Sequence, residues 1–109
     1  MRRWPDIVAE LSRMEDARRQ TQRQLDQINR QITRRMTALI PLLQPKQTAP
    51  RRGKPPDPGA FLERYGANLA AITAERQPEI DALERKLGRQ DLAIATLRER
   101  HHLHPGSAA

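Results

Sequence analysis

Four arginines in the first half of the sequence lie on one side of a predicted helix, and their spacing suits them to bind an anion. They are Arg19, Arg23, Arg30 and Arg34. At about 100° per residue they fall within a sector of about 60°, nearly opposite the apolar stripe of the same helix. Such a helix can pack through its apolar stripe while its guanidinium groups follow the phosphates of a nucleic acid.

The alternative is that this basic face is an ordinary solvated surface. Asp16 and Asp26 lie in or beside the same sector. Glu15 with Arg19, and Asp26 with Arg30, have the i,i+4 spacing of favourable ion pairs on a helix. The sequence leaves both interpretations open.

A second group of basic residues, Arg51, Arg52 and Lys54, lies in a proline-rich stretch. The run Arg52-Gly53-Lys54-Pro55 resembles the core of an AT-hook, with lysine in place of the second arginine of the hook. The resemblance is confined to these few residues. It implies an extended backbone lying in a narrow A·T minor groove. The alternative is a stiff linker that its charges keep solvated.

No motif of a catalytic centre is found. The sequence has no glycine-rich phosphate loop, no H-E-x-x-H and no nucleophile elbow. Without cysteine it has neither disulfides nor thiolate ligands. His101 and His104 have an i,i+3 spacing, but no carboxylate accompanies them at a ligand distance, so a cationic last turn of a helix is the favoured interpretation. We expect no enzyme, no cofactor, no metal and no small-molecule substrate.

The positive charge is unevenly distributed. The 109 residues carry a net charge of +7, with 30% charged and 37% hydrophobic residues. Nine arginines against five acids lie in residues 1–43, four basic residues against one acid in 44–58, and seven of each sign in 59–109. This asymmetry favours an anionic partner for the first half and the linker.

No apolar run approaches the roughly 20 residues of a membrane span. The N-terminus is basic but lacks the apolar segment of a secretory signal. We therefore expect a cytoplasmic protein that does not bind membranes.

Residues 1–43 are predicted to form one long amphipathic helix, from Pro5 to between Ile40 and Leu43. The positions of its stripe alternate by four and three over five heptads. They are Ile7, Leu11, Met14, Arg18, Thr21, Leu25, Ile28, Ile32, Arg35, Leu39 and Leu42. Arg18 and Arg35 interrupt the pattern, with Ala17 and Met36 beside them, and these breaks could specify a partner.

Residues 44–58 contain too many prolines for a helix and are predicted to be a linker, with Asp57 as N-cap of the next helix. Residues 59–102 form the second arm, with a kink or restart at Pro78. Residues 103–109 are a disordered tail. The predicted packing residues of both arms are Ile7, Leu11, Met14, Leu25, Ile28, Ile32, Leu39, Leu69, Ile72, Ile80, Leu83, Leu87, Ile94 and Leu97.

Two arms of similar length joined by one linker predict an all-α fold, a long coiled-coil-like antiparallel hairpin. Because two helices leave each stripe half covered, we expect a homo-oligomer that forms a helical bundle, with a dimer favoured. The alternative is a monomeric hairpin. The favoured function is a non-enzymatic adaptor, scaffold or assembly factor in a larger complex. The alternative is an accessory protein that binds the duplex phosphate backbone through the basic helix face and linker.

Overall fold

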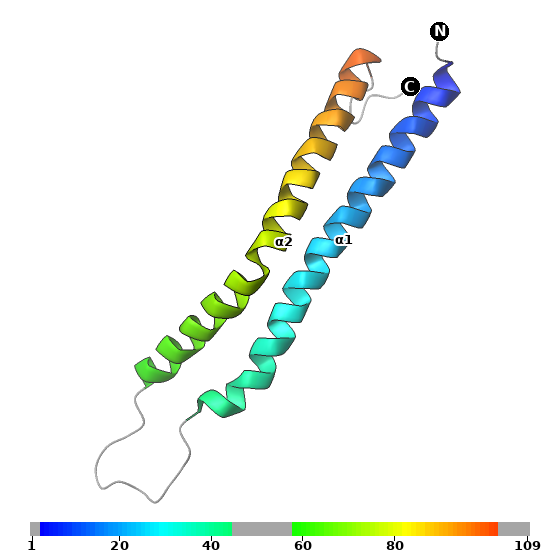
Figure 1. Cartoon of the computed structure of the whole chain (residues 1–109). Coiled ribbons are helices and arrows are strands. Elements are labelled where there is room, and N and C mark those ends of the chain that lie inside the picture. The colour runs from blue at the N-terminus through cyan, green and yellow to red at the C-terminus, as the bar shows by residue number, and fades with distance from the viewer. Residues whose placement is uncertain (1–2, 45–57, 103–109) are drawn as a thin grey trace, which may run out of the picture. The chain divides into compact units, whose positions relative to one another are not determined.

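The computed structural model describes residues 3–44 and 58–102, and these form two α-helices. Helix α1 spans Trp4–Leu43 and helix α2 spans Pro58–Arg100 (Figure 1). The all-α hairpin predicted from the sequence is confirmed. The predicted N-cap Asp57, the basic linker residues Arg51, Arg52 and Lys54, and the predicted tail 103–109 lie outside the described residues.

The chain divides into two units, and each contains a segment of both helices. Unit 1 comprises Met1–Asp26 and Glu79–Ala109, and unit 2 comprises Gln27–Pro78. In unit 1, Glu15 contacts Arg98 whereas the later Arg18 contacts the earlier Asp91, so the two helices run antiparallel. In unit 2, Gln31 contacts Arg76 and Leu43 contacts Arg64, which gives the same direction.

The ends of α1 follow from its backbone hydrogen bonds. The carbonyl of Arg3 accepts from the N–H groups of Asp6 (3.0 Å) and Ile7 (3.1 Å), so the helix begins at Trp4. Pro41 lies inside the helix, which continues to Leu43. The last turn has no basic residue of its own, and Arg64 of α2 donates from Nε (3.2 Å) and Nη2 (2.9 Å) to the Leu43 carbonyl. A guanidinium there satisfies an orphan carbonyl and complements the helix dipole.

Helix α2 continues through Pro78, so the predicted restart is wrong. A proline removes one N–H donor from a helix, and the neighbouring residues here are mostly good helix formers that keep the helical backbone. The kink stays a prediction. At the other end, His101 N donates to Leu97 O (3.2 Å), and His102 takes a left-handed φ of 55°, the conformation with which many helices end.

The core of each unit is one narrow stripe along the facing helices. In unit 1 the buried residues are Ile7, Thr21, Leu25, Ile94 and Leu97. In unit 2 they are Ile28, Ile32, Met36 and Ile72. Partly buried apolar residues flank both sets, among them Phe61 and Tyr65, whose ring centroids lie 6.2 Å apart.

The stripe of α1 departs from the predicted heptads after Ile32. Met36 is 2% exposed where the strict pattern places Arg35, and Leu42 is 77% exposed. The buried positions therefore advance by four residues twice, from Ile28 to Ile32 to Met36. Two steps of four move the stripe back towards the 3.6-residue period of a straight helix, which a strict heptad does not follow without supercoiling.

Helix α2 shows the same pair of four-residue steps. Its inward positions pass from the buried Ile72 to the partly buried Arg76 and Ile80. Before Arg76, the inward positions of α2 are Phe61, Tyr65, Asn68 and Ile72. The predicted packing residue Leu69 lies one position away from this set and is 37% exposed, so it does not join the core.

Thr21 is the most buried side chain described, at 1% exposed. Its hydroxyl donates to the Ala17 carbonyl at 3.1 Å, which already serves the helix ladder. Valine has nearly the same shape, so Thr21→Val should raise the free energy of unfolding by about 1 kcal/mol, because it removes a desolvated hydroxyl from an apolar stripe.

Thr96 is the matched control for this prediction. Its hydroxyl makes the same bond to the Leu92 carbonyl (2.8 Å), but the residue is exposed. Thr96→Val should change the free energy of unfolding by less than about 0.5 kcal/mol, when urea titrations of both variants are compared with that of the wild type. A destabilised Thr21→Val variant would show that the hydroxyl contributes more than its burial costs.

Candidate interaction surfaces

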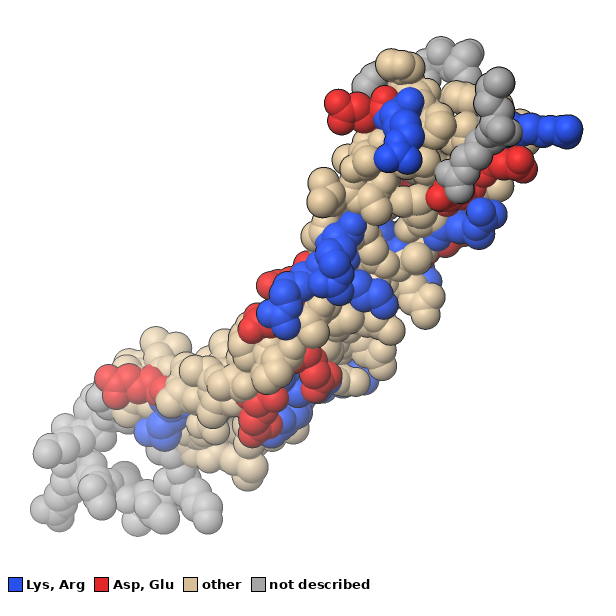
Figure 2. All heavy atoms as spheres, turned by 45° about the horizontal axis from the view of Figure 1, so that its top comes forward, with Lys and Arg blue, Asp and Glu red and all other residues tan. Residues whose placement is uncertain are grey.

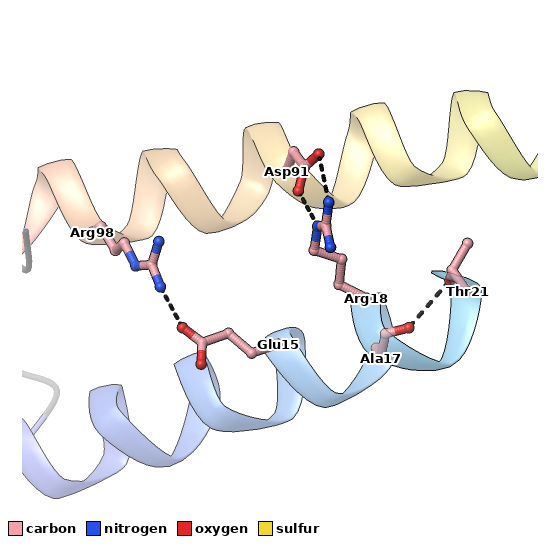
Figure 3. A network of polar contacts seen from close by, with 6 residues as sticks. All are labelled: Glu15, Ala17, Arg18, Thr21, Asp91 and Arg98. Atoms are coloured by element: carbon pink, nitrogen blue, oxygen red, sulfur yellow. Dashed lines mark hydrogen bonds and ion pairs between the residues drawn. The ribbon is translucent and has the colours of Figure 1, made fainter. Parts of the chain in front are cut away.

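Arg18 interrupts the apolar stripe of α1 and is paired across the hairpin. Its guanidinium donates from Nε to one carboxylate oxygen of Asp91, and its Nη2 lies 3.5 Å from the other (Figure 3). Hydrogen bonding to Asp91, followed by its negative charge, raises the pKa of Arg18. A raised arginine pKa means that this stabilisation is present at all pH values below the ordinary range of arginine and is lost only in strong alkali.

A second cross-helix pair lies one turn away on α1. Arg98 Nη2 donates to Glu15 Oε1 at 2.5 Å, as Figure 3 shows. The two side chains are 33% and 32% exposed, less than those of the Arg18–Asp91, Arg19–Asp16 and Arg35–Glu75 pairs. Partial burial reduces solvent screening, so this pair should contribute more than a fully exposed one.

Unit 2 has its own cross-helix contacts. Arg35 Nη1 lies 2.7 Å from Glu75 Oε2, and Arg76 Nη1 donates to Gln31 Oε1 at 2.8 Å. The two arginines that interrupt the predicted heptads, Arg18 and Arg35, are thus both bound by acids of α2. Each of the two arginines thus has a binding partner within the chain, and the interpretation that these breaks specify an outside partner stays a prediction.

The four predicted anion-binding arginines of α1 are all exposed. Arg19 and Arg23 belong to unit 1, and Arg30 and Arg34 belong to unit 2. Arg19 pairs with Asp16 of the same helix. The other three, Arg23, Arg30 and Arg34, make no hydrogen bond or ion pair with the described residues.

The two i,i+4 ion pairs expected from the sequence, Glu15–Arg19 and Asp26–Arg30, are not formed among the described residues. Glu15 is bound to Arg98 of α2, which leaves Arg19 to Asp16. The Asp26 carboxylate accepts from Gln22 Nε2 at 3.1 Å. Cross-helix packing thus takes up an acid that would otherwise neutralise the basic face.

The two units differ in charge. The described part of unit 1 has ten basic and ten acidic residues, whereas that of unit 2 has five basic and two acidic residues. On the face shown in Figure 2, acidic side chains lie among basic ones. The excess positive charge of the described residues therefore belongs to unit 2.

The predicted packing residues fall into three groups by exposure. The buried ones are Ile7, Leu25, Ile28, Ile32, Ile72, Ile94 and Leu97. The partly buried ones are Leu11, Met14, Leu39, Ile80, Leu83 and Leu87, and Leu69 is exposed. Met36, which we had placed only beside the stripe, is buried.

Large apolar side chains remain exposed on both helices. Trp4 (51% exposed) and Val8 (45%) are one turn apart on α1 in unit 1. On α2, Leu62 (65%) and Leu92 (70%) are further examples, in units 2 and 1 respectively. These side chains offer apolar contact area that the hairpin itself does not use.

In the described residues, no three histidine or acidic side chains are grouped to hold a metal ion. Neither described helix is long and apolar enough to cross a membrane. In comparisons with protein-family models, curated proteins and solved structures, the chain matches none. Function must therefore be argued from the surfaces of the hairpin.

The sequence did not lead us to the acids that form ion pairs with Arg18 and Arg35. Asp91 and Glu75 were counted only as part of a balanced second arm. A signal was available: an arginine that a heptad pattern places at the seam between two helices can reach an acid on the facing helix. Pairing the arms in antiparallel register would have placed acids near both arginines.

The Glu15–Arg98 pair can be tested by charge exchange. Glu15→Arg and Arg98→Glu should each lower the free energy of unfolding by about 1 kcal/mol, and the double variant should recover most of the loss. The control is the Asp16–Arg19 pair, whose side chains are 64% and 57% exposed. Its exchange should show a coupling of only about 0.3–0.5 kcal/mol in denaturant titrations. Equal coupling for the two pairs would show that crossing between helices adds nothing.

Proposed function

We propose that this protein is a non-enzymatic helical hairpin that acts as an adaptor, scaffold or assembly factor by packing its exposed helix faces against other proteins. The proposal includes self-association into a coiled-coil-like bundle, with a dimer favoured. It assigns no catalytic residue, no cofactor and no small-molecule substrate.

The observation that carries the proposal is how the hairpin uses its apolar residues. Each helix buries one stripe, and Arg18 and Arg35, which interrupt the predicted heptads of α1, pair with acids of α2. Trp4 and Val8 remain together on the surface of unit 1. Exposed aromatic and aliphatic side chains at i,i+4 are the anchors with which a helix packs against a partner helix.

The adaptor proposal predicts a protein contact at Val8. A photo-crosslinking residue at Val8, in the cells that make the protein, should give an adduct with a distinct second protein. Val8→Asp should weaken the complex by about tenfold or more, because burial of a valine side chain contributes about 1.5–3 kcal/mol.

Ala9 is the matched control position, since it is also exposed but points about 100° away around the helix. A crosslinker at Ala9 should give little of the same adduct. Equal adducts at Val8 and Ala9, or none at either, would count against a partner on this face.

A second candidate function, binding to the duplex phosphate backbone, is supported by Arg30 and Arg34. Both are exposed without a partner among the described residues, and they lie in the unit with excess positive charge. The described α1 segment 27–44 contains no acid. Phosphate contacts do not require aromatic residues, of which this chain has few, although base stacking would.

This second function predicts salt-sensitive retention of duplex DNA in a mobility-shift assay. Replacing Arg30 and Arg34 together with Gln should reduce the slope of log affinity against log salt by about 2, since each phosphate contact contributes about 0.9. Arg35→Gln is the control, because the neighbouring Arg35 is already bound to Glu75. If the control changed the slope as much as the double variant, or if no duplex were retained at low salt, the phosphate-binding function would be rejected.

A further inference from the structure

A row of α2 residues in unit 2 has the spacing of a packing stripe and lies one position outside the inward stripe, with partly buried Thr73 at its end. These residues, which we term the open strip, are Leu62, Gly66, Leu69 and Thr73. They are separated by four, three and four residues, the spacing of a heptad seam. Each follows a position of the inward stripe by one residue, so the strip runs beside the hairpin core, and Leu62 (65%) and Leu69 (37%) are exposed.

Three of the four strip residues, Gly66, Leu69 and Thr73, lie in a segment without charges. Residues 65–74 include no Lys, Arg, Asp or Glu, although 30% of the chain is charged. A solvated helix face usually carries charged side chains. The composition of this segment instead indicates a second packing surface.

Gly66 in the middle of the strip is not needed for packing between the described parts of α1 and α2. A Cβ atom added there would meet nothing within 4 Å. Glycine also destabilises a helix interior relative to alanine, so neither packing within the chain nor helix stability explains it. An open glycine, here as at Gly88, leaves room for another molecule to approach the helix backbone closely.

Helix α1 extends the uncharged surface on the same flank. The Arg35–Glu75 ion pair marks one flank of unit 2 on both helices. By helical register, Thr33 and Ile40 of α1 lie on the other flank, together with the open strip. The Thr33 hydroxyl donates to the Asn29 carbonyl at 3.0 Å, so it can be covered without losing its hydrogen bond.

We propose that a second copy of this chain packs on the open strip of unit 2. The strip is self-complementary: in an antiparallel two-fold arrangement, Leu69 of one copy lies over the partner's Gly66, and Leu69 of the partner lies over Gly66 of the first. Two uncharged surfaces meet without repulsion, although unit 2 carries an excess of basic residues elsewhere. A nucleic acid or an acidic protein would be drawn to those basic residues and not to this flank.

The expected interface is small. It spans about three turns of helix on each copy, which is below the roughly 1,200 Å² of buried surface typical of a stable complex. The dimer should therefore be weak, with a Kd on the order of 10–100 µM. This inference rests on the self-association included in the proposed function and deepens it, because it assigns the surface on which two copies pair.

Sedimentation of the full chain over a concentration series tests the inference. Leu69→Asp should raise the dimer Kd by about tenfold or more, because it buries an unpaired charge at the centre of the interface. Leu92→Asp is the matched control, an exposed leucine of the same helix outside the strip (70% exposed), and should leave the Kd unchanged. Circular dichroism should show full helix content in both variants.

A glycine pair separates interface effects from helix stability. Gly88, like Gly66, has nothing within 4 Å of an added Cβ. Both Gly66→Ala and Gly88→Ala should raise the melting temperature of the monomer, because alanine favours the helix. Only Gly66→Ala should also weaken the dimer, by about fivefold, because its methyl group meets the partner's Leu69.

A wild-type chain that stays monomeric at about ten times the expected Kd would overturn the inference, as would equal weakening by Leu69→Asp and Leu92→Asp. The crosslinked adduct of Val8 with a second protein distinguishes a failure of this inference from a failure of the adaptor role. If that adduct forms while no dimer is found, only the self-association surface fails. If dimers form through Leu69 but Val8 gives no adduct, only the adaptor role fails.

Discussion

Two helices packed side by side can bury only one narrow stripe each, and this constraint governs the rest of the structure. A stripe of interchangeable aliphatic residues resists sliding only weakly, because a shift of one turn replaces one apolar contact with another. Cross-helix ion pairs do not tolerate such a shift. Glu15 with Arg98 in unit 1 and Arg35 with Glu75 in unit 2 each hold the antiparallel register of their own unit. Their contribution lies more in register than in stability, since partly exposed pairs are individually weak.

The same constraint explains the polar residues within the stripe. Thr21 satisfies its hydroxyl on its own helix, whereas the buried Oε1 of Gln90 has no hydrogen-bond partner among the described residues. Such groups reduce stability relative to leucine or valine. A polar residue at a stripe position also disfavours alternative pairings, which is its best-attested role in coiled coils. The polar residues of the stripe thus lower the stability of the hairpin and favour one arrangement of its helices.

The distribution of charge separates two kinds of surface. Unit 1 balances its charges and uses several of them between its helices, which leaves exposed apolar groups such as Trp4 and Val8 for contact. The described part of unit 2 has few acids, and Arg30 and Arg34 of α1 have no partner there, while an uncharged strip runs along α2. The proposed anion binding and the proposed apolar packing are therefore compatible within unit 2, because they would use different helix faces.

The sequence by itself determined the two helices and their direction. Periodic apolar residues, prolines at the first helix and between the arms, and the absence of glycine runs specify local backbone structure, which depends on near neighbours. Only the tertiary structure decided the phase of the stripes and the partners of the charges. Met36 is buried in place of Arg35, and Leu69 is exposed, because the stripe returns towards the 3.6-residue period at those points. A heptad count from the sequence cannot show where that return occurs. Glu15 bound Arg98 and not Arg19 because a facing helix competes with the i,i+4 neighbour, and that competition depends on contacts between residues far apart in the chain.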